Sequence, residues 1–182
     1  SYTAGSITVA VTSTSDCDGD GVTNADETTD GTDPTDPCSF ILTSATTAPD
    51  AAWNAADCDG DGVTNGDEVT DGTDPLDDCS FIVTSITVAV TSTSDCDGDG
   101  VTNADESTDG TDPTDPCSFI LTSATTAPDA AWLAADCDGD GVTNGQEITD
   151  GTDPSDDCSY VLGSISLAVT STSDCDGDGV TN

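Results

Sequence analysis

A twelve-residue stretch from residue 16 to residue 27 constrains the fold of this chain more than any other feature. It reads Asp-Cys-Asp-Gly-Asp-Gly-Val-Thr-Asn-Ala-Asp-Glu, so oxygen-bearing side chains stand at positions 1, 3, 5, 9 and 12. Gly21 stands at position 6, where the chain must turn sharply if those side chains are to face one centre. A hard divalent cation such as Ca²⁺ takes about six to eight oxygen ligands, and a glutamate at position 12 can supply two of them. The spacing therefore predicts a calcium-binding loop, to which position 7 adds its backbone carbonyl.

The same pattern recurs along the chain. Complete copies lie at residues 57–68, 95–106 and 136–147, and a fifth copy begins at residue 174. A single Asp-Gly run would indicate an ordinary turn, but four complete copies exclude coincidence. The predicted metal ligands, at positions 1, 3, 5, 7, 9 and 12, are Asp16, Asp18, Asp20, Val22, Asn24 and Glu27; Asp57, Asp59, Asp61, Val63, Asn65 and Glu68; Asp95, Asp97, Asp99, Val101, Asn103 and Glu106; Asp136, Asp138, Asp140, Val142, Asn144 and Glu147; and Asp174, Asp176, Asp178, Val180 and Asn182.

A second group of aspartates follows each loop and predicts a second calcium site beside the first. The alternative is an Asx turn with solvated charges. We favour the metal site, because carboxylates packed so densely would otherwise repel one another. These residues are Asp30, Asp33 and Asp36; Asp71, Asp74 and Asp77; Asp109, Asp112 and Asp115; and Asp150, Asp153 and Asp156.

The balance of charge makes the chain depend on dissolved cations. The sequence has 38 acidic residues and no lysine, arginine or histidine, which gives a formal charge of −38. We therefore expect a calcium-poor chain to be expanded by self-repulsion. Nucleic acid and anionic membranes are excluded as partners, because binding phosphate requires cationic side chains. We expect no enzymatic activity, since there is no basic side chain and the carboxylates are engaged by metal.

Few apolar residues are available for a core. Hydrophobic residues make up 33% of the sequence and aromatic residues 4%, so we expect small local cores instead of one large core. No apolar run approaches the ~20 residues that span a bilayer, and no segment has the pattern of a signal peptide. We expect no membrane insertion within this segment.

Nine cysteines predict an oxidising compartment, and hence a secreted or cell-surface location. Each of the first four loop cysteines is followed by another cysteine 21 residues later, whereas the onward separations are 20 or 17 residues. Because a constant spacing suggests a constant covalent unit, we predict four disulfides, each worth roughly 3 kcal/mol. These are Cys17–Cys38, Cys58–Cys79, Cys96–Cys117 and Cys137–Cys158. Zinc binding is the alternative, but there is no histidine and no Cys-x-x-Cys pair.

The chain repeats with a period of 79 residues, which is the separation of Cys17 and Cys96. Each period holds two loop units, one long connector and one short connector. The chain begins just after an expected cysteine and ends inside a loop, so we expect a longer array or a subunit completed by its neighbour. The predicted segments are a strand-like connector at 1–15, loop units at 16–38, 57–79, 95–117 and 136–158, long connectors at 39–56 and 118–135, short connectors at 80–94 and 159–173, and a truncated loop unit at 174–182.

The connectors predict short β-strands. In the short connector, Ile86, Val88 and Val90 alternate with Thr87 and other small residues, a period-2 pattern rich in β-branched side chains. The long connector opens with an apolar run, residues 40–42, that also favours a strand. One face of such a strand must be covered, and the sequence leaves its partner open.

Helical turns are predicted at two kinds of place. A one-turn helix should follow each loop, for instance at residues 24–30, and end at Gly31 in a left-handed cap. Residues 49–53 of the long connector predict a helical turn, with an extended conformation as the alternative. Trp53 and Trp132 are predicted to cap small cores next to the loops, and the alternative role is a platform for stacking a ligand.

The loop and the Asp-Gly-Thr-Asp-Pro segment that follows it resemble thrombospondin type 3 repeats, particularly those of large bacterial cell-surface and secreted proteins. The resemblance covers the loop units, roughly half of the chain, and implies an extracellular, calcium-loaded array in which metal replaces the hydrophobic core. EF-hand and dockerin loops share the ligand spacing, but no amphipathic helix precedes these loops. The connectors and the cysteine positions depart from the family pattern, so the disulfide connectivity of the family is not carried over.

The expected fold class is an elongated tandem array of calcium-binding loops with little regular secondary structure, short β-strands in the connectors and one-turn helices after the loops. We expect the chain to form the rod or filament of an extracellular protein, with calcium ions and neighbouring repeats or identical subunits as its partners. The alternative is a calcium-dependent adhesin that binds a glycan or a protein.

Overall fold

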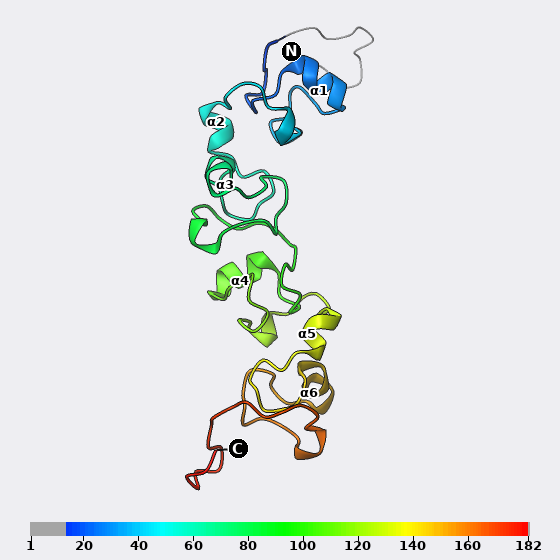
Figure 1. Ribbon diagram of the computed structural model, residues 1–182, viewed down its shortest axis with the longest axis vertical. Helices are drawn as coiled ribbons and strands as arrows, with labels where there is room; N and C mark the ends of the chain where they lie inside the picture. The colour runs from blue at the N-terminus through cyan, green and yellow to red at the C-terminus, as the bar shows by residue number, and fades with distance from the viewer. Residues whose placement is uncertain (1–13, 182) are drawn as a thin grey trace. The chain divides into compact units, whose positions relative to one another are not determined.

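The computed structural model describes residues 14–181, so predictions that concern residues 1–13 or Asn182 lie outside it (Figure 1). The chain divides into two compact units, Ser1–Thr91 and Ser92–Asn182. The first unit contains α1 (Asn24–Asp30), the 3₁₀ turn η1 (Leu42–Ser44), α2 (Ala51–Asn54), α3 (Asn65–Asp71) and η2 (Val83–Ser85). The second unit contains α4 (Asn103–Asp109), η3 (Leu121–Ser123), α5 (Ala130–Ala134), α6 (Asn144–Asp150) and η4 (Leu162–Ser164).

A short helix follows each complete loop, as predicted, and its two ends have local causes. At the start of α1, the Thr23 hydroxyl accepts a hydrogen bond from the Asp26 N–H. At the other end, Gly31 adopts a left-handed conformation with φ 84° and donates its N–H to the Glu27 carbonyl. The helices α3, α4 and α6 have the same two caps. Each of these helices has seven residues, about two turns, instead of the one turn expected.

The β-strands predicted in the connectors are wrong, because residues 14–181 contain no strand. The short connector of the first unit instead wraps around its own loop. The N–H groups of Thr87 and Val88 donate to the Gly62 carbonyl at 2.9 and 3.1 Å, and Thr91 donates to the Gly60 carbonyl at 2.8 Å. The loop thus supplies the acceptors that a neighbouring strand would have supplied.

The period-2 apolar pattern of this connector has a local explanation too. A β-carbon at Gly62 would lie 2.7 Å from a methyl of Val90 and 3.0 Å from a methyl of Ile86. These side chains therefore cover the loop, whereas Val88 between them is 40% exposed. The alternation of apolar and polar residues therefore arises because the connector packs on the loop, and not because it forms a strand of a sheet.

The long connector also forms no strand at residues 40–42, where Phe40 enters the core and the 3₁₀ turn η1 begins at Leu42. The helical turn predicted around residue 50 is confirmed as α2. The Asp50 carboxylate accepts hydrogen bonds from the N–H groups of Ala52 and Trp53, both at 2.8 Å, and so caps the helix.

The cores are small and local, as the composition predicts. In the first unit, Val22, Phe40 and Trp53 form one buried cluster, and the two aromatic rings meet edge to face with centroids 5.4 Å apart. In the second unit, Phe119 and Trp132 repeat this contact at 5.3 Å. Both tryptophans are 1% exposed. Their predicted core role is therefore confirmed, and the alternative of a ligand-stacking platform is wrong.

The predicted disulfide pairs are wrong as well. The structure pairs Cys38 with Cys58, Cys117 with Cys137, and Cys158 with Cys175, while Cys79 and Cys96 are disulfide-bonded and Cys17 is free and exposed. This overturns Cys17–Cys38, Cys58–Cys79, Cys96–Cys117 and Cys137–Cys158. The bonds Cys38–Cys58, Cys117–Cys137 and Cys158–Cys175 each join the end of one loop unit to the start of the next and so span a connector.

The reason for the different pairing is the path of the connector. The indole N–H of Trp53 donates to the Pro37 carbonyl at 2.9 Å, which returns the connector to the end of the preceding loop unit, next to Cys38. Cys58 lies five residues after Trp53 and is therefore brought close to Cys38. The constant separation of 21 residues reflects the constant length of the loop unit and not a covalent closure.

Within residues 14–181, no helix has both the length and the apolar character needed to span a lipid bilayer.

Candidate metal centres

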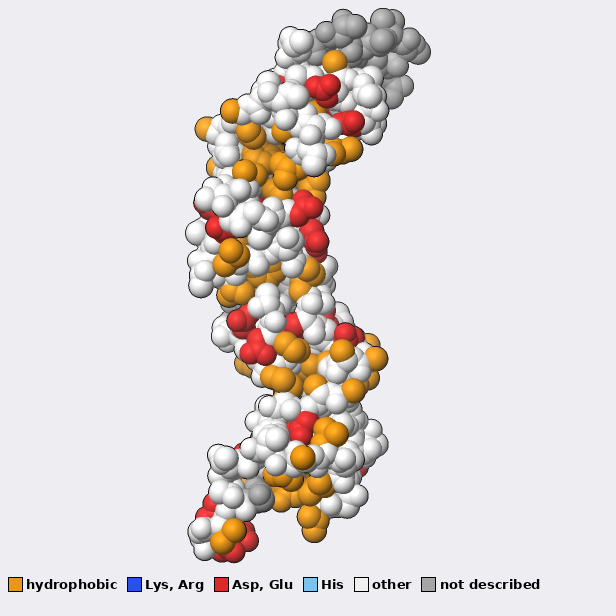
Figure 2. Space-filling view, viewed as in Figure 1, with side chains coloured by type: hydrophobic (Ala, Val, Ile, Leu, Met, Phe, Trp, Pro, Cys, Tyr) orange, Lys and Arg blue, Asp and Glu red, His pale blue; other side chains and the backbone are white. Residues whose placement is uncertain are grey.

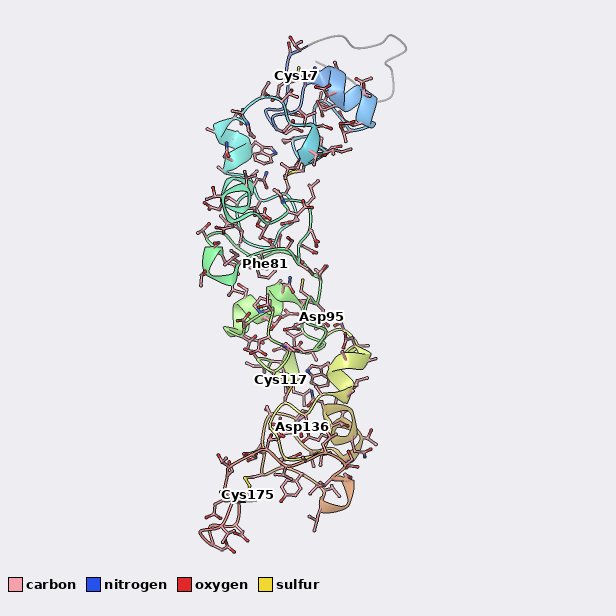
Figure 3. The ribbon with its side chains drawn as sticks, in the orientation of Figure 1. Cys17, Phe81, Asp95, Cys117, Asp136 and Cys175 are labelled. Carbon is pink, nitrogen blue, oxygen red and sulfur yellow. A yellow bond between two sulfur atoms is a disulfide. The ribbon has the colours of Figure 1, made fainter. Side chains whose placement is uncertain are left out.

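The first aspartate of each loop shapes the backbone of that loop. In loop 1 (16–27), one carboxylate oxygen of Asp16 accepts the Gly19 N–H at 2.7 Å, and the other accepts the Gly21 N–H at 2.9 Å. Both glycines have positive φ, 85° and 94°, a conformation that other residues rarely adopt. The same pair of hydrogen bonds occurs at Asp57 in loop 2 (57–68), Asp95 in loop 3 (95–106) and Asp136 in loop 4 (136–147). Asp95 and Asp136 are labelled in Figure 3.

Carboxylate oxygens without a hydrogen-bond partner are buried inside each complete loop. In loop 1 these are both oxygens of Asp18, one of Asp20 and both of Glu27, which has no exposed surface. The corresponding oxygens in the other loops belong to Asp59, Asp61 and Glu68; Asp97, Asp99 and Glu106; and Asp138, Asp140 and Glu147. An unpaired buried carboxylate costs several kcal/mol. No side chain of this protein can offset that cost, since the sequence has no lysine, arginine or histidine.

The same burial raises the pKa of the glutamate at position 12 of each complete loop. Burial, together with the charges of Asp18 and Asp20, raises the pKa of Glu27 from 4.5 to about 8. The glutamates at position 12 of loops 2, 3 and 4, namely Glu68, Glu106 and Glu147, have their pKa raised to about 8 for the same reason. At neutral pH each site therefore requires either a proton or a cation.

The donor set fits calcium. Within each of loops 1, 2 and 3, the aspartates at positions 1, 3 and 5 each offer an oxygen within 4.8 Å of the others. The donors are hard carboxylate oxygens, which suit Ca²⁺. In loops 1, 2 and 3 the structure therefore brings together the predicted ligands at positions 1, 3 and 5, while coordination itself stays a prediction. The position-12 glutamate of each of these loops lies close enough for the charges of those aspartates to raise its pKa. Acidic side chains also reach the surface in the space-filling view, where no basic side chain accompanies them (Figure 2).

The asparagine at position 9 already has a structural role. The side-chain oxygen of Asn24 accepts the Cys17 N–H at 3.1 Å, and its amide nitrogen lies 3.0 Å from the Cys17 sulfur. In loop 2, the Asn65 amide also donates to the Trp53 carbonyl at 3.1 Å. These side chains tie position 9 to position 2 of the same loop. Their predicted role as ligands stays a prediction, as does that of the carbonyl at position 7.

The fifth loop has the same turn as the complete ones. The carboxylate of Asp174 accepts the N–H groups of Gly177 and Gly179, both at 2.8 Å, and that of Asp178 accepts the Val180 N–H at 2.8 Å. The residues of this loop are exposed, and Asn182, a predicted ligand, lies outside the described residues.

The predicted second sites contain Asx turns. One oxygen of Asp33 accepts both the N–H and the hydroxyl of Thr35, and one oxygen of Asp36 accepts the Cys38 N–H at 3.1 Å. The turn at the second aspartate recurs at Asp74, Asp112 and Asp153, and that at the third aspartate at Asp77, Asp115 and Asp156. None of these oxygens is among the buried ones without a partner. A second calcium at these aspartates therefore stays a prediction.

Sequence reasoning missed the residues that close over the loops from the connectors. In loop 1, the N–H groups of Thr46 and Thr47 donate to the Gly21 carbonyl, and Asp50 donates to the Gly19 carbonyl at 2.8 Å. The spacing of the loop ligands carries no sign of this contact. The signal that the sequence does offer is a constant separation along the chain between the glycine at loop position 6 and the connector residue that donates to its carbonyl, as for Gly21 and Thr47 or Gly62 and Val88.

Comparison with known families gives one match. The family model described as a bacterial TSP3 repeat matches residues 16–37, 57–78, 95–116 and 136–156, which are the four complete loops with the turns that follow them. No curated protein and no solved structure matches the chain.

Proposed function

Because this chain carries four bacterial TSP3 repeats, we propose that it is a calcium-stabilised, disulfide-bonded structural repeat that forms the rod or filament of an extracellular or cell-surface protein. The observation that carries the proposal is the set of buried carboxylate oxygens without a partner in each complete loop. A bound calcium ion supplies the positive charge that the side chains of this protein lack.

Calcium would stabilise each loop by mass action. An ion that binds the folded loop and not the unfolded chain adds stability that grows with its free concentration. Extracellular calcium-binding modules work with dissociation constants of about 10⁻⁴ to 10⁻³ M. Sites of modest affinity would therefore be occupied outside the cell, where disulfides such as Cys38–Cys58 also persist.

The repeated architecture supports a structural role. Each unit has its own small core and its own set of loops, so added repeats would add length without a new fold. The partners we propose are calcium ions and neighbouring repeats or identical subunits. We propose neither enzymatic activity nor nucleic-acid binding, since the sequence offers no basic side chain for either.

The adhesin alternative has lost its main support. It assigned glycan stacking to Trp53 and Trp132, and both rings are buried against phenylalanine with their indole N–H groups hydrogen-bonded to proline carbonyls. A tryptophan in that position cannot stack on a ligand without leaving the core. No other observation favours the adhesin.

Removal of calcium tests the proposal. On titration with a calcium chelator, the near-ultraviolet circular dichroism of Trp53 and Trp132 should weaken and the radius of gyration should increase. Added Ca²⁺ should restore both signals, and Mg²⁺ at the same concentration should restore them less, because it gives up its water ligands reluctantly. An unchanged spectrum and radius after complete metal removal would rule the proposal out. Electron microscopy of native material then tests whether rods or filaments form.

A further inference from the structure

Each complete loop is covered by the connector that follows it, through equivalent backbone hydrogen bonds. At one connector position, the N–H donates to the carbonyl of the glycine at loop position 6, at distances between 2.9 and 3.1 Å. The residues at that position are Thr47 over loop 1, Val88 over loop 2, Thr126 over loop 3 and Leu167 over loop 4. The backbone contact is thus the same in all four loops.

The side chains at this position alternate between two kinds. The Thr47 hydroxyl lies 3.3 Å from one oxygen of Asp16, the first residue of loop 1, and 3.0 Å from the Gly21 carbonyl. The Thr126 hydroxyl donates to the equivalent oxygen of Asp95 at 2.8 Å. Valine and leucine have no hydroxyl, so loops 2 and 4 lack this donor.

The threonine hydroxyl acts on the carboxylate that shapes the loop. The Asp16 oxygen that faces Thr47 also accepts the Gly21 N–H, so two donors fix the orientation of that carboxylate. Groups that orient a metal ligand without touching the metal commonly change affinity by about 10- to 100-fold when they are lost. A carboxylate that is already oriented loses less freedom when an ion binds.

We propose that Thr47 and Thr126 are positioning residues that divide the four complete loops into two classes, with loops 1 and 3 binding calcium more tightly than loops 2 and 4. This inference rests on the proposed function, since it concerns the same loops. The classes alternate along the chain because long and short connectors alternate.

Charge does not account for the same division. Loops 2 and 4 have a neighbouring carboxylate that the other loops lack, from Asp78 and Asp157, which are replaced by proline at positions 37 and 116. Loops 1 and 3 have one from Asp50 and Asp129, whose carboxylate carbons approach the glycine at loop position 4. Each loop therefore has one added negative charge of this kind, so a difference in charge does not separate the two classes.

The test compares three variants of the full chain. Thr47→Val with Thr126→Val removes both hydroxyls, Thr47→Ser with Thr126→Ser keeps them, and Val88→Thr with Leu167→Thr adds them to the other two loops. Val88 and Leu167 are both at least 40% exposed, so the added threonines have room. Binding is measured by calorimetric titration with Ca²⁺ alone.

The glycine at loop position 6 identifies which loop fills. The N–H groups of Gly21, Gly62, Gly100 and Gly141 each donate to the first aspartate of their own loop, so their amide resonances report on that loop. In the unmodified chain, the Gly21 and Gly100 signals should shift at lower calcium than the other two. The valine variant should bind about tenfold more weakly in loops 1 and 3. The serine variant should bind like the unmodified chain, and the threonine variant should tighten loops 2 and 4.

The outcomes separate this inference from the proposed function. If no loop takes up calcium, the proposed function fails. If all four loops fill together, and the valine and threonine variants titrate like the unmodified chain, the two classes are overturned while calcium binding stands. Equal weakening by serine and valine would also overturn the role of the hydroxyl. If the valine variant does not fold in saturating calcium, the threonine variant alone decides.

Discussion

The glutamate at position 12 is the residue through which the fold depends most directly on a cation. It is fully buried in each complete loop, and one or both of its oxygens have no hydrogen-bond partner. Replacing it should have opposite effects with and without calcium, because the change removes a ligand and also a buried charge.

We predict this for Glu68→Gln. The variant should bind calcium in loop 2 at least about tenfold more weakly, since a bidentate ligand is lost. Without calcium it should unfold at a higher denaturant concentration than the unmodified chain, because the uncharged amide costs less to bury. Asp67→Gln is the matched control. Residue 67 is exposed, and loop 4 carries Gln146 there. Equal effects of the two substitutions would contradict the role of Glu68.

The pH dependence of the calcium-free protein follows from the same residues. The four position-12 glutamates have their pKa raised from 4.5 to about 8 by burial and by neighbouring carboxylates. A raised pKa means that the folded state binds protons more tightly than the unfolded state. The stability gained from those protons is complete below pH 4.5 and is lost as the pH rises through about 8. The denaturant concentration at the midpoint of unfolding, measured in chelator, should therefore decrease as the pH is raised from 5 to 8.5.

Saturating calcium should remove that decrease, because the ion binds the deprotonated carboxylates. Midpoints that rise with pH in chelator would contradict the assignment of the buried glutamates. Midpoints that fall equally with and without calcium would show that other groups control the transition.

Among the helices, those of the long connectors, α2 and α5, pack against the helices of the loops that follow them, α3 and α6. The helix α2 ends against α3 at Gly66, where a β-carbon would lie 2.9 Å from the Asn54 carbonyl oxygen. In loop 4, a β-carbon at Gly145 would lie 2.8 Å from the Leu133 carbonyl oxygen. Loop 3 follows a connector that the structure describes without such a helix, and it carries alanine at this position. The glycine is required by the helix that precedes it.

We therefore predict that Gly66→Ala destabilises the first unit. The clash should cost about 1–3 kcal/mol, against roughly 1 kcal/mol gained from the better helix propensity of alanine. Gly163→Ala is the control, since nothing lies within 4 Å of a β-carbon there. Guanidinium unfolding in saturating calcium measures both variants. A stabilised Gly66→Ala protein would show that α2 does not press on loop 2.

The sequence predicted those elements whose causes lie within a few residues. The helix at residues 24–30 was predictable, because Gly31 supplies its stop and the threonine before it supplies its cap. The strands were wrong because alternation only shows that one face is covered. It does not show that Gly62 of the same chain, instead of a sheet, covers the side chains of Ile86 and Val90. The roles of Thr47 and Asn65 were not predictable, since both depend on contacts with another segment.

At the scale of the whole molecule, the disulfides show why spacing alone misleads. Bonded cysteines are separated by 20 or 17 residues. The constant separation of 21 residues is that between the two cysteines of one loop unit, which are not bonded to each other. Pairing depends on how the connector folds back, and that path is set by α2 and the buried Trp53.

The Cys38–Cys58 bond should contribute to the stability of the first unit in proportion to the loop that it closes. With a separation of 20 residues, replacing both cysteines by serine should cost about 3 kcal/mol, measured by guanidinium unfolding in calcium. Cys17→Ser is the control, because that cysteine is free and exposed. A loss of the same size in both variants would mean that the bond adds no stability.

The hydrogen bonds between connector and loop limit how such chains can join one another. In the described part of the chain, the short connectors use N–H groups on carbonyls of their own loops and form no strand. Copies of this protein therefore have no open sheet edge there onto which a foreign strand could add. A polymer that joined through these two connectors would have to use side chains, bound ions or disulfides at its junctions.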